Sequence, residues 1–288
     1  MKLEIQNLSL HFGKQKVLDN LTLTINKGEI WGIVGANGTG KTSLFSCLQG
    51  IYKHYDGIIT YTPYNKKYIS NIPQRATLPD NMDVLRFLQM MGTLKGLSHY
   101  QATKQAMSFL HELAIDYAVH HQLKHLSNGL QMAVNIIQAF MGDPHIVFLD
   151  EPNSGLDPKM SSLLKRFLQD HKQEKTYIIS SHNLAFIEEM CSHVAILHGG
   201  KLIYKDVLSK ATQQDNVYNI KSNLPLSKTI DHLKKCKHIS MVLADPYTNI
   251  IYIESTQDIS HDLFTHIPQL IYYQKGITLK NMYLRLIR

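Results

Sequence analysis

The 288-residue chain is long enough for one large domain or two, and its 44% hydrophobic and 18% charged residues are typical of a globular protein. Its three cysteines lie far apart and form no C-x-x-C pair, which argues against a disulfide framework or a zinc site, and the net charge of +7 is dispersed rather than gathered in runs typical of nucleic-acid binding. No apolar run approaches the roughly 18 residues needed to cross a bilayer, so we expect a soluble, intracellular chain with no membrane span of its own.

The first 34 residues read as strands joined by turns, because apolar and polar residues alternate at 21–25 before an Asn-Lys-Gly turn. From residue 83 to about 125, apolar side chains repeat at helical spacing, with Ala106, Phe109 and Leu110 on one face. Short apolar runs follow at 146–149, 177–180 and 194–197, separated by helical segments. This alternation predicts a buried, mainly parallel sheet.

The signals change after residue 200. Runs at 217–220, 239–243 and 250–254 are typical of strands, and helical patterns occur near 228–236 and 278–287. From Lys201 onward there are 12 Lys and Arg against 7 Asp and Glu, so 12 − 7 = +5 of the net charge lies in this part. We therefore expect two domains, 1–205 and 206–288, the second a small α+β appendage.

The strongest motif is GANGTGKT at residues 35–42, which matches G-x-x-x-x-G-K-S/T and directly follows the apolar stretch 30–34. Glycines let such a loop curl into a nest of N–H donors at a helix N-terminus, where phosphate binds. Lys41 is expected to reach the β- and γ-phosphates, and the Thr42 hydroxyl to ligate Mg²⁺. We predict that the chain binds ATP and Mg²⁺ through Gly35, Ala36, Asn37, Gly38, Thr39, Gly40, Lys41, Thr42 and Ser43.

Two acids, Asp150 and Glu151, follow the apolar run at 146–149. A carboxylate at the end of such a strand is suited to hold Mg²⁺ through its water shell, and we assign Asp150 to that role. Glu151 points the other way along an extended chain and is suited to polarise the water that attacks the γ-phosphate. The alternative is that the two acids serve only solubility. The presence of the phosphate-binding motif in the same chain makes that alternative less favoured.

Further short motifs occur in a fixed order around these two. Residues 126–130, LSNGL, resemble the LSGGQ signature of ABC transporters, and residues 154–158, SGLDP, resemble their D-loop. Gln74 stands where that family has its Q-loop glutamine, His182 where it has its switch histidine, and Phe12 where an aromatic ring stacks on adenine. Residues 1–205 therefore resemble the ATP-binding subunit of an ABC transporter. The resemblance implies the α/β P-loop NTPase fold of ABC ATPases: a mainly parallel core sheet, an N-terminal β subdomain and a helical subdomain at about 78–140.

The resemblance also implies a mode of action. Two such domains pack head to tail, and ATP is held between the P-loop of one and Ser127, Asn128 and Gly129 of the other. Because the chain has one P-loop, the second domain is another copy or a different chain. The same resemblance implies a polytopic membrane subunit as partner, a location on the cytoplasmic face of the membrane and no nucleic-acid partner. It assigns catalytic roles to Glu151, His182, Gln74 and Asp157, and metal ligation to Thr42, Gln74 and Asp150.

The signature departs from the family pattern at Asn128, which replaces a glycine, and at Leu130, which replaces glutamine. Many ABC-2-type exporters read LSxGM here, and residues 277–287, ITLKNMYLRLI, resemble the ending of such subunits. Both features favour export over import. Within that class the candidates are exporters of phenol-soluble modulins, antimicrobial-peptide immunity and drug export. By the same resemblance, the stretch 83–96 forms the groove that receives a helix of the membrane subunit, with Met90, Met91 and Tyr100 as candidate contact residues.

Two other functions are compatible with a P-loop. One is a soluble ABC ATPase that acts on ribosomes or DNA. Relatives of that kind carry two P-loops or a long coiled coil between P-loop and signature, whereas Lys41 and Ser127 are only 127 − 41 = 86 residues apart. The other is a sensor that binds ATP without hydrolysing it, which would not need a water-polarising carboxylate such as Glu151.

Overall fold

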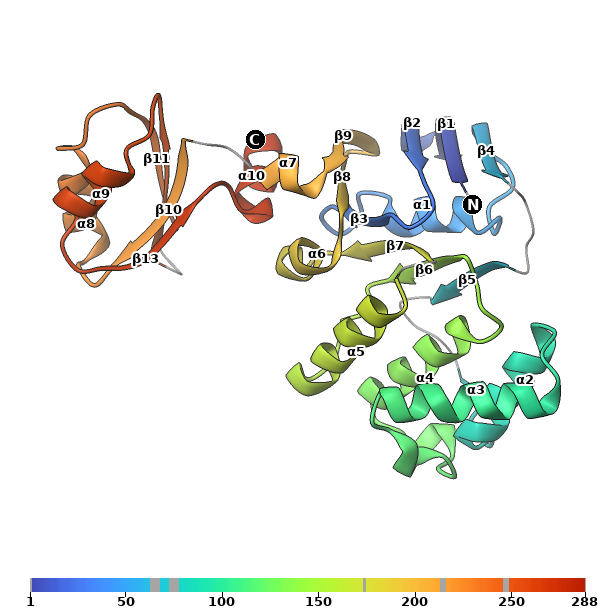
Figure 1. Ribbon diagram of the computed structural model, residues 1–288. Helices are drawn as coiled ribbons and strands as arrows, with labels where there is room; N and C mark the ends of the chain where they lie inside the picture. The colour runs from blue at the N-terminus through green and yellow to red at the C-terminus, as the bar shows by residue number, and fades with distance from the viewer. Residues whose placement is uncertain are drawn as a thin grey trace. The chain divides into compact units, whose positions relative to one another are not determined.

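The computed structural model describes residues 2–62, 68–72, 78–172, 175–212, 216–245 and 249–287 (Figure 1). The chain divides into two compact units, Met1–Lys205 and Asp206–Arg288. Each unit has its own sheets and its own hydrophobic core.

A six-stranded sheet forms the centre of the first unit, with strand order β5-β6-β7-β3-β8-β9. The strands are β3 (Ile30–Val34), β5 (Ile69–Ile72), β6 (Ile146–Asp150), β7 (Thr176–Ser181), β8 (His193–His198) and β9 (Lys201–Val207). The pairs β5–β6, β6–β7, β7–β3 and β3–β8 are parallel. Every residue of β3 and β6 is buried, as expected for parallel strands covered on both faces. The predicted parallel sheet is confirmed.

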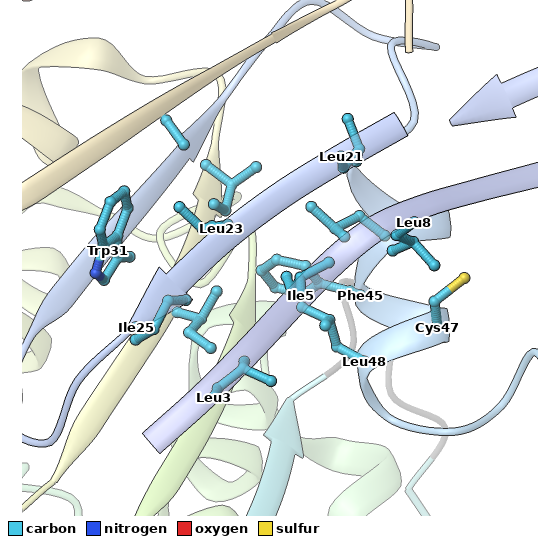
Figure 2. Packing of buried hydrophobic residues seen from close by; sticks show 14 of the residues in the cluster. Leu3, Ile5, Leu8, Leu21, Leu23, Ile25, Trp31, Phe45, Cys47 and Leu48 are labelled. Carbon is cyan, nitrogen blue, oxygen red and sulfur yellow. The ribbon is translucent and has the colours of Figure 1, made fainter. Parts of the chain in front are cut away.

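An antiparallel sheet, β2-β1-β4, forms the N-terminal part of this unit, built from β1 (Lys2–Phe12), β2 (Gln15–Ile25) and β4 (Asp56–Thr62). Its apolar side chains pack against helix α1 (Lys41–Leu48) and the central sheet in one hydrophobic core. Figure 2 shows Ile5 of β1 beside Phe45 and Leu48 of α1. The helix that begins in the P-loop is therefore fixed by packing along its length.

Helices α2 (Val84–Leu94), α3 (His99–Glu112) and α4 (Asn128–Phe140) pack on one another, and short 3-10 turns at Asp116–Ala118 and Leu123–His125 connect α3 to α4. Each helix begins at a polar cap: Asp83 caps α2, Ser98 forms a capping box with Gln101, and Ser127 caps α4. The helical periodicity seen at 83–125 thus corresponds to real helices (Figure 1).

An aromatic cluster joins these helices to α5 (Pro158–Asp170), while α6 (Leu184–Met190) follows β7 and packs on β3 and β7. Phe109 of α3 and Phe140 of α4 make edge contacts with Phe167 of α5, at centroid distances of 5.4 and 4.9 Å. His171, which ends α5, lies with its Nε2 atom 2.7 Å from Oε2 of Glu112 on α3. Helix α5 therefore packs against α3 and α4, and the ring of Phe140 also lies 5.9 Å from that of Tyr177 on β7.

Lys95 forms a second connection between the helices and the sheet. Its ammonium group donates hydrogen bonds to Ser70 Oγ of β5 and to the backbone carbonyls of Gln138 and Ala139 at the end of α4, at 2.8, 2.7 and 2.9 Å. Burial lowers the pKa of Lys95 to about 8. The lysine satisfies carbonyl oxygens that the end of a helix leaves without partners.

The second unit has a four-stranded sheet of order β11-β12-β10-β13, in which all neighbouring strands are antiparallel. Its elements are α7 (Leu208–Thr212), β10 (Val217–Ser222), α8 (Leu226–Leu233), β11 (Ile239–Asp245), β12 (Ile250–Ser255), α9 (Ser260–His266), β13 (Leu270–Lys275) and α10 (Leu279–Leu286). From β10 to β13 the chain order is βαββαβ, the split arrangement of ferredoxin-like folds. The sequence patterns predicted three of these strands and two of these helices; they missed α7, α9 and β13.

Candidate active site

The loop 35–42 connects the central strand β3 to α1 and has the backbone that its sequence predicts. Gly38 and Gly40 have φ values of 80° and 104°, which side-chain-bearing residues rarely adopt. A Cβ atom at Gly35 would lie 2.5 Å from the carbonyl oxygen of Leu197, so this position also requires glycine. Gly40 is the N-cap of α1 and offers no side-chain cap. The first N–H groups of the helix therefore remain available to an anion.

Lys41 lies on the inside of this loop with only 7% of its surface exposed. Its Nζ atom donates to the carbonyls of Gly35 and Ala36, at 2.7 and 3.1 Å. Burial lowers the pKa of Lys41, and the charges of Glu151 and Asp150 partly oppose that change. An ammonium group beside exposed helical N–H groups is a suitable site for the phosphates of a nucleotide.

Asp150 ends β6 beside the first turn of α1. Its Oδ2 atom lies 3.4 Å from the Thr42 hydroxyl, and its Oδ1 atom accepts a hydrogen bond from Ser180 of β7. Burial is the main cause that raises the pKa of Asp150. A carboxylate and a hydroxyl are hard oxygen ligands that suit Mg²⁺, which usually takes one or two protein groups together with substrate phosphates. The pair of Asp150 and Thr42 therefore fits Mg²⁺. A different kind of metal site, made of three or more His, Cys, Asp or Glu side chains, does not occur among the described residues.

Glu151 is 4% exposed and has a φ of 51°, an uncommon conformation for a residue other than glycine. This turn aims its carboxylate at the end of β7. Oε1 accepts from the backbone N–H of His182 at 3.0 Å, while Oε2 lies 3.2 Å from the Ser181 hydroxyl and 2.9 Å from Nδ1 of His182. The structure thus brings Glu151 and His182 together, and it places Lys41, Thr42 and Asp150 beside them.

Three polar residues of this site carry no recognisable motif and were missed. Ser180 donates to Asp150, and its hydroxyl and carbonyl oxygens accept from the backbone N–H of Glu151, at 3.2 and 3.1 Å. Ser181 contacts Glu151 and Asn153, the latter at 3.2 Å. Because β6 and β7 are parallel neighbours that both end here, polar residues at the end of β7 were the available signal.

Other predicted residues lie elsewhere or have further contacts. Phe12 is 47% exposed at the β1–β2 turn and makes an edge contact with Tyr52 at 5.4 Å. Asp157 caps α5 by accepting from the N–H of Met160 at 2.8 Å. Among the described residues, no hydrogen bond joins Ser127, Asn128 or Gly129 to the chain's own P-loop. Gln74 lies outside the described residues.

Comparison with known proteins settles the family. The model of the ABC transporter family matches residues 18–154. An uncharacterized ABC transporter ATP-binding protein of Methanocaldococcus jannaschii is 35% identical over 242 residues, which cover 81% of this chain and 91% of that protein. The chain belongs to the ATP-binding proteins of ABC transporters. It is therefore an ATPase, of a family that hydrolyses ATP to drive transport and works with membrane components.

Two further similarities of this ABC ATP-binding protein agree with the family. The linearmycin resistance ATP-binding protein LnrL of Bacillus subtilis is 28% identical over 210 residues, 70% of this chain and 68% of that protein. A solved structure of the ATP-binding subunit of an ABC transporter superposes with a TM-score of 0.69 and 26% identity, covering 73% of this chain and 92% of that one. In the part of the chain that the structure describes, no helix is both long and apolar enough to cross a membrane.

Proposed function

We propose that this chain is the ATP-hydrolysing subunit of an ABC-2-type exporter that moves peptides or drugs. In this proposal two nucleotide-binding domains close head to tail on ATP, and the movement drives a separate polytopic membrane subunit from its cytoplasmic face. The proposal goes beyond the family in direction, cargo and assembly.

The position of the signature segment carries the proposal. Ser127 and Asn128 are exposed at the start of α4, a 13-residue helix whose N-terminus favours an anion. Within the described residues they make no hydrogen bond to the P-loop of the same chain. A second domain would bring the missing half of each site, its signature against this P-loop and its P-loop against this signature.

The proposed roles of the site residues follow from their contacts. Lys41 and the N–H groups of residues 35–42 would hold the phosphates, while Phe12 would stack on the base. Thr42 and Asp150 would hold Mg²⁺, which supplies positive charge to the phosphate oxygens when bound. Glu151 would accept a proton from the attacking water, and His182 would hold Glu151 through the 2.9 Å contact.

A groove on the helical part is suited to receive the membrane subunit. It has a volume of about 570 Å³ and is lined by Asp83, Leu85, Arg86, Gln89, Met90, Thr93, His99 and His120. Met90 is 37% exposed, whereas Leu88 on the same helix is fully buried. Mixed charge and an adaptable methionine are typical of a surface that receives a helix of another protein.

The direction of transport is inferred from sequence resemblance. The departures at Asn128 and Leu130 and the final helix α10 resemble ABC-2-type exporters, and one relative is described as a linearmycin resistance protein. The alternative of a soluble ATPase on ribosomes or DNA finds no specific support in the site.

Cysteine crosslinking tests the assembly, because all three native cysteines, at 47, 191 and 236, are buried. A Met90→Cys chain, expressed in its native cells and crosslinked in their membranes, should become bonded to a polytopic membrane protein. The matched control is Ile58→Cys, at a residue of β4 that is 58% exposed, and it should not crosslink. In a homodimer, a chain with both Asn37→Cys and Ser127→Cys should form ATP-dependent crosslinked dimers. A chain with only one of these substitutions should form none, because each bond joins position 37 of one copy to position 127 of the other. Equal labelling of the membrane protein by both Met90→Cys and Ile58→Cys would contradict the groove.

A further inference from the structure

The hydroxyl of Ser181 occupies a central place between the proposed catalytic carboxylate and the loop that follows it. Ser181 ends β7 and is completely buried. Its Oγ atom lies 3.2 Å from Glu151 Oε2, 3.2 Å from Asn153 Oδ1 and 3.0 Å from the backbone N of Asn183. Three polar groups therefore converge on one oxygen that water does not reach.

The number of hydrogens limits how these contacts can be made. The Ser181 hydroxyl has one hydrogen to donate and two lone pairs that accept. The N–H of Asn183 is a donor and takes one lone pair. Of the two oxygens within reach of the hydroxyl hydrogen, the one on Glu151 belongs to a carboxylate, and a hydrogen bond to an ionised acceptor is about twice as strong as a neutral one. The hydroxyl therefore donates to Glu151.

That choice decides what Asn153 does. The oxygen and the NH₂ group of an asparagine amide exchange places when the amide turns by half a rotation. With the hydroxyl hydrogen committed to Glu151, an NH₂ group turned toward Ser181 would fill the second lone pair. In this arrangement the Ser181 oxygen donates one hydrogen bond and accepts two, whereas the oxygens of Ser181 and Asn153 facing each other would form no hydrogen bond between them.

The consequence is a chain of hydrogen bonds that ends at Glu151. Two N–H donors onto Oγ polarise the hydroxyl toward the carboxylate, and bonds in such a chain strengthen one another where the local dielectric is low. The other oxygen of Glu151 accepts from the backbone N–H of His182 at 3.0 Å. Both carboxylate oxygens are thus oriented from the end of β7, which fixes the plane of the carboxylate.

We propose that Ser181 is a positioning residue for Glu151, and that Asn153 acts through the Ser181 hydroxyl. This inference rests on the catalytic role proposed above for Glu151. Asn153 begins the segment that runs through the exposed residues Ser154 and Gly155 to Asp157, the cap of α5. A displacement of that exposed segment would change the position of the Glu151 carboxylate, because the Asn153 amide and the Ser181 hydroxyl connect the two.

Steady-state ATPase assays on the full chain test the role of Ser181. Removing one hydrogen bond to a charged group is expected to lower kcat of Ser181→Ala by at least about tenfold. KM for ATP should stay within about twofold, because the hydroxyl contacts the carboxylate and not the P-loop. Ser181→Thr retains the hydroxyl and should restore most of kcat.

Ser192→Ala is the matched control. Ser192 directly precedes β8, and its hydroxyl bonds the backbone N and O of Ile30, at 3.0 and 3.2 Å, at the opposite end of β3 from the P-loop. Its kcat should equal that of the unmodified chain. Wild-type kcat in Ser181→Ala, or an equal loss in Ser181→Ala and Ser181→Thr, would overturn the proposal, since the second result would trace the loss to packing.

Substitutions at Asn153 test the proposed path. Asn153→Asp puts an acceptor where the NH₂ group is expected, so it should compete for the Ser181 hydrogen and lower kcat about as much as Ser181→Ala. Asn153→Ala removes one donor without adding an acceptor and should cost about threefold or less. In the double variant Ser181→Ala with Asn153→Asp, kcat should be no lower than in Ser181→Ala alone. A further large loss would show that the aspartate acts directly on Glu151 and would overturn the path through Ser181.

A separate variant isolates the role of Glu151 itself. If Glu151→Gln retained full turnover, the proposed catalytic role would fail whatever Ser181 does. If Glu151→Gln were inactive while Ser181→Ala was fully active, only the present inference would fail. Equilibrium dialysis with labelled ATP and the melting temperature of each variant show that the compared chains are folded and bind nucleotide equally.

Discussion

The Nδ1 atom of His182 lies 2.9 Å from Oε2 of Glu151, so two of the residues proposed for catalysis are in direct contact within one chain. The His182 side chain is 61% exposed, whereas that of Glu151 is 6% exposed. The histidine thus covers the solvent side of a buried carboxylate.

This arrangement predicts the behaviour of Glu151→Gln. The amide keeps the size of the side chain but cannot accept a proton from water, so kcat should fall by about 10²- to 10⁴-fold, the range for loss of a general base. ATP affinity should change little, and the ATP-bound dimer should persist in size-exclusion chromatography. Turnover equal to that of the unmodified chain would remove Glu151 from the proposed role.

Lys41→Ala should weaken nucleotide binding. The ammonium group is buried on the inside of the P-loop, and a charge-assisted hydrogen bond to phosphate is worth about 1.5 to 3 kcal/mol. The dissociation constant for ATP should rise by at least about tenfold in isothermal titration. Lys201→Ala, which removes an exposed lysine paired with Asp19, is the control and should bind ATP normally.

Phe12→Ala should raise the ATP concentration needed for half-maximal activity with little effect on kcat. The ring is 47% exposed and is held edge-on by Tyr52, so one face is free for a base. Stacking of a base on an aromatic side chain is worth about 1 to 3 kcal/mol. Phe12→Tyr, which keeps the aromatic face, should behave normally. An unchanged ATP requirement in Phe12→Ala would exclude the ring from the site.

Lys95 should make the stability of the chain depend on pH in the alkaline range. Its pKa is about 8 in the folded chain against an ordinary value of 10.5, so the unfolded chain binds more protons between these values. The free energy of unfolding should therefore increase as the pH rises from about 8 to about 10.5. This added stability should be lost again as the pH falls back through 8. Urea denaturation of the unmodified chain and of Lys95→Met gives this contribution as the difference between their pH profiles. Parallel profiles would contradict the prediction.

The sequence predicted those parts of the fold in which neighbouring residues determine the structure. The apolar run of β3, the glycines of the P-loop and the helical spacing of Ala106 and Phe109 all depend on residues close in the chain. Helix α9 was missed because its apolar residues, such as Leu263, lie among polar ones without a clear period. Strand β13 begins with the continuous apolar and aromatic run at 270–273, a strand signal that was missed. Their positions depend on packing against the core of the second unit.

The same limit applies to the site. Lys41, Thr42, Asp150 and His182 were predicted from motifs, and the structure places them near one another; their chemical roles stay predictions. Ser180, Ser181 and Asn153 could not be found in this way, since serine and asparagine are frequent in many loops. Their contacts arise because β6 and β7 are adjacent, parallel and of matching register, with Asp150 opposite Ser180.

The strand order of the central sheet also has a consequence for how the chain folds during its synthesis. β3 leaves the ribosome early, but its two neighbours, β7 and β8, are made much later; the contact between Gly28 and Thr176, at the start of β3 and β7, spans 148 residues. Until then both edges of an apolar strand lack their partners and are prone to pair with other chains. Slow elongation between codons 35 and 175 should therefore increase aggregation of nascent chains more than slow elongation after codon 207, where the last strand of the sheet ends.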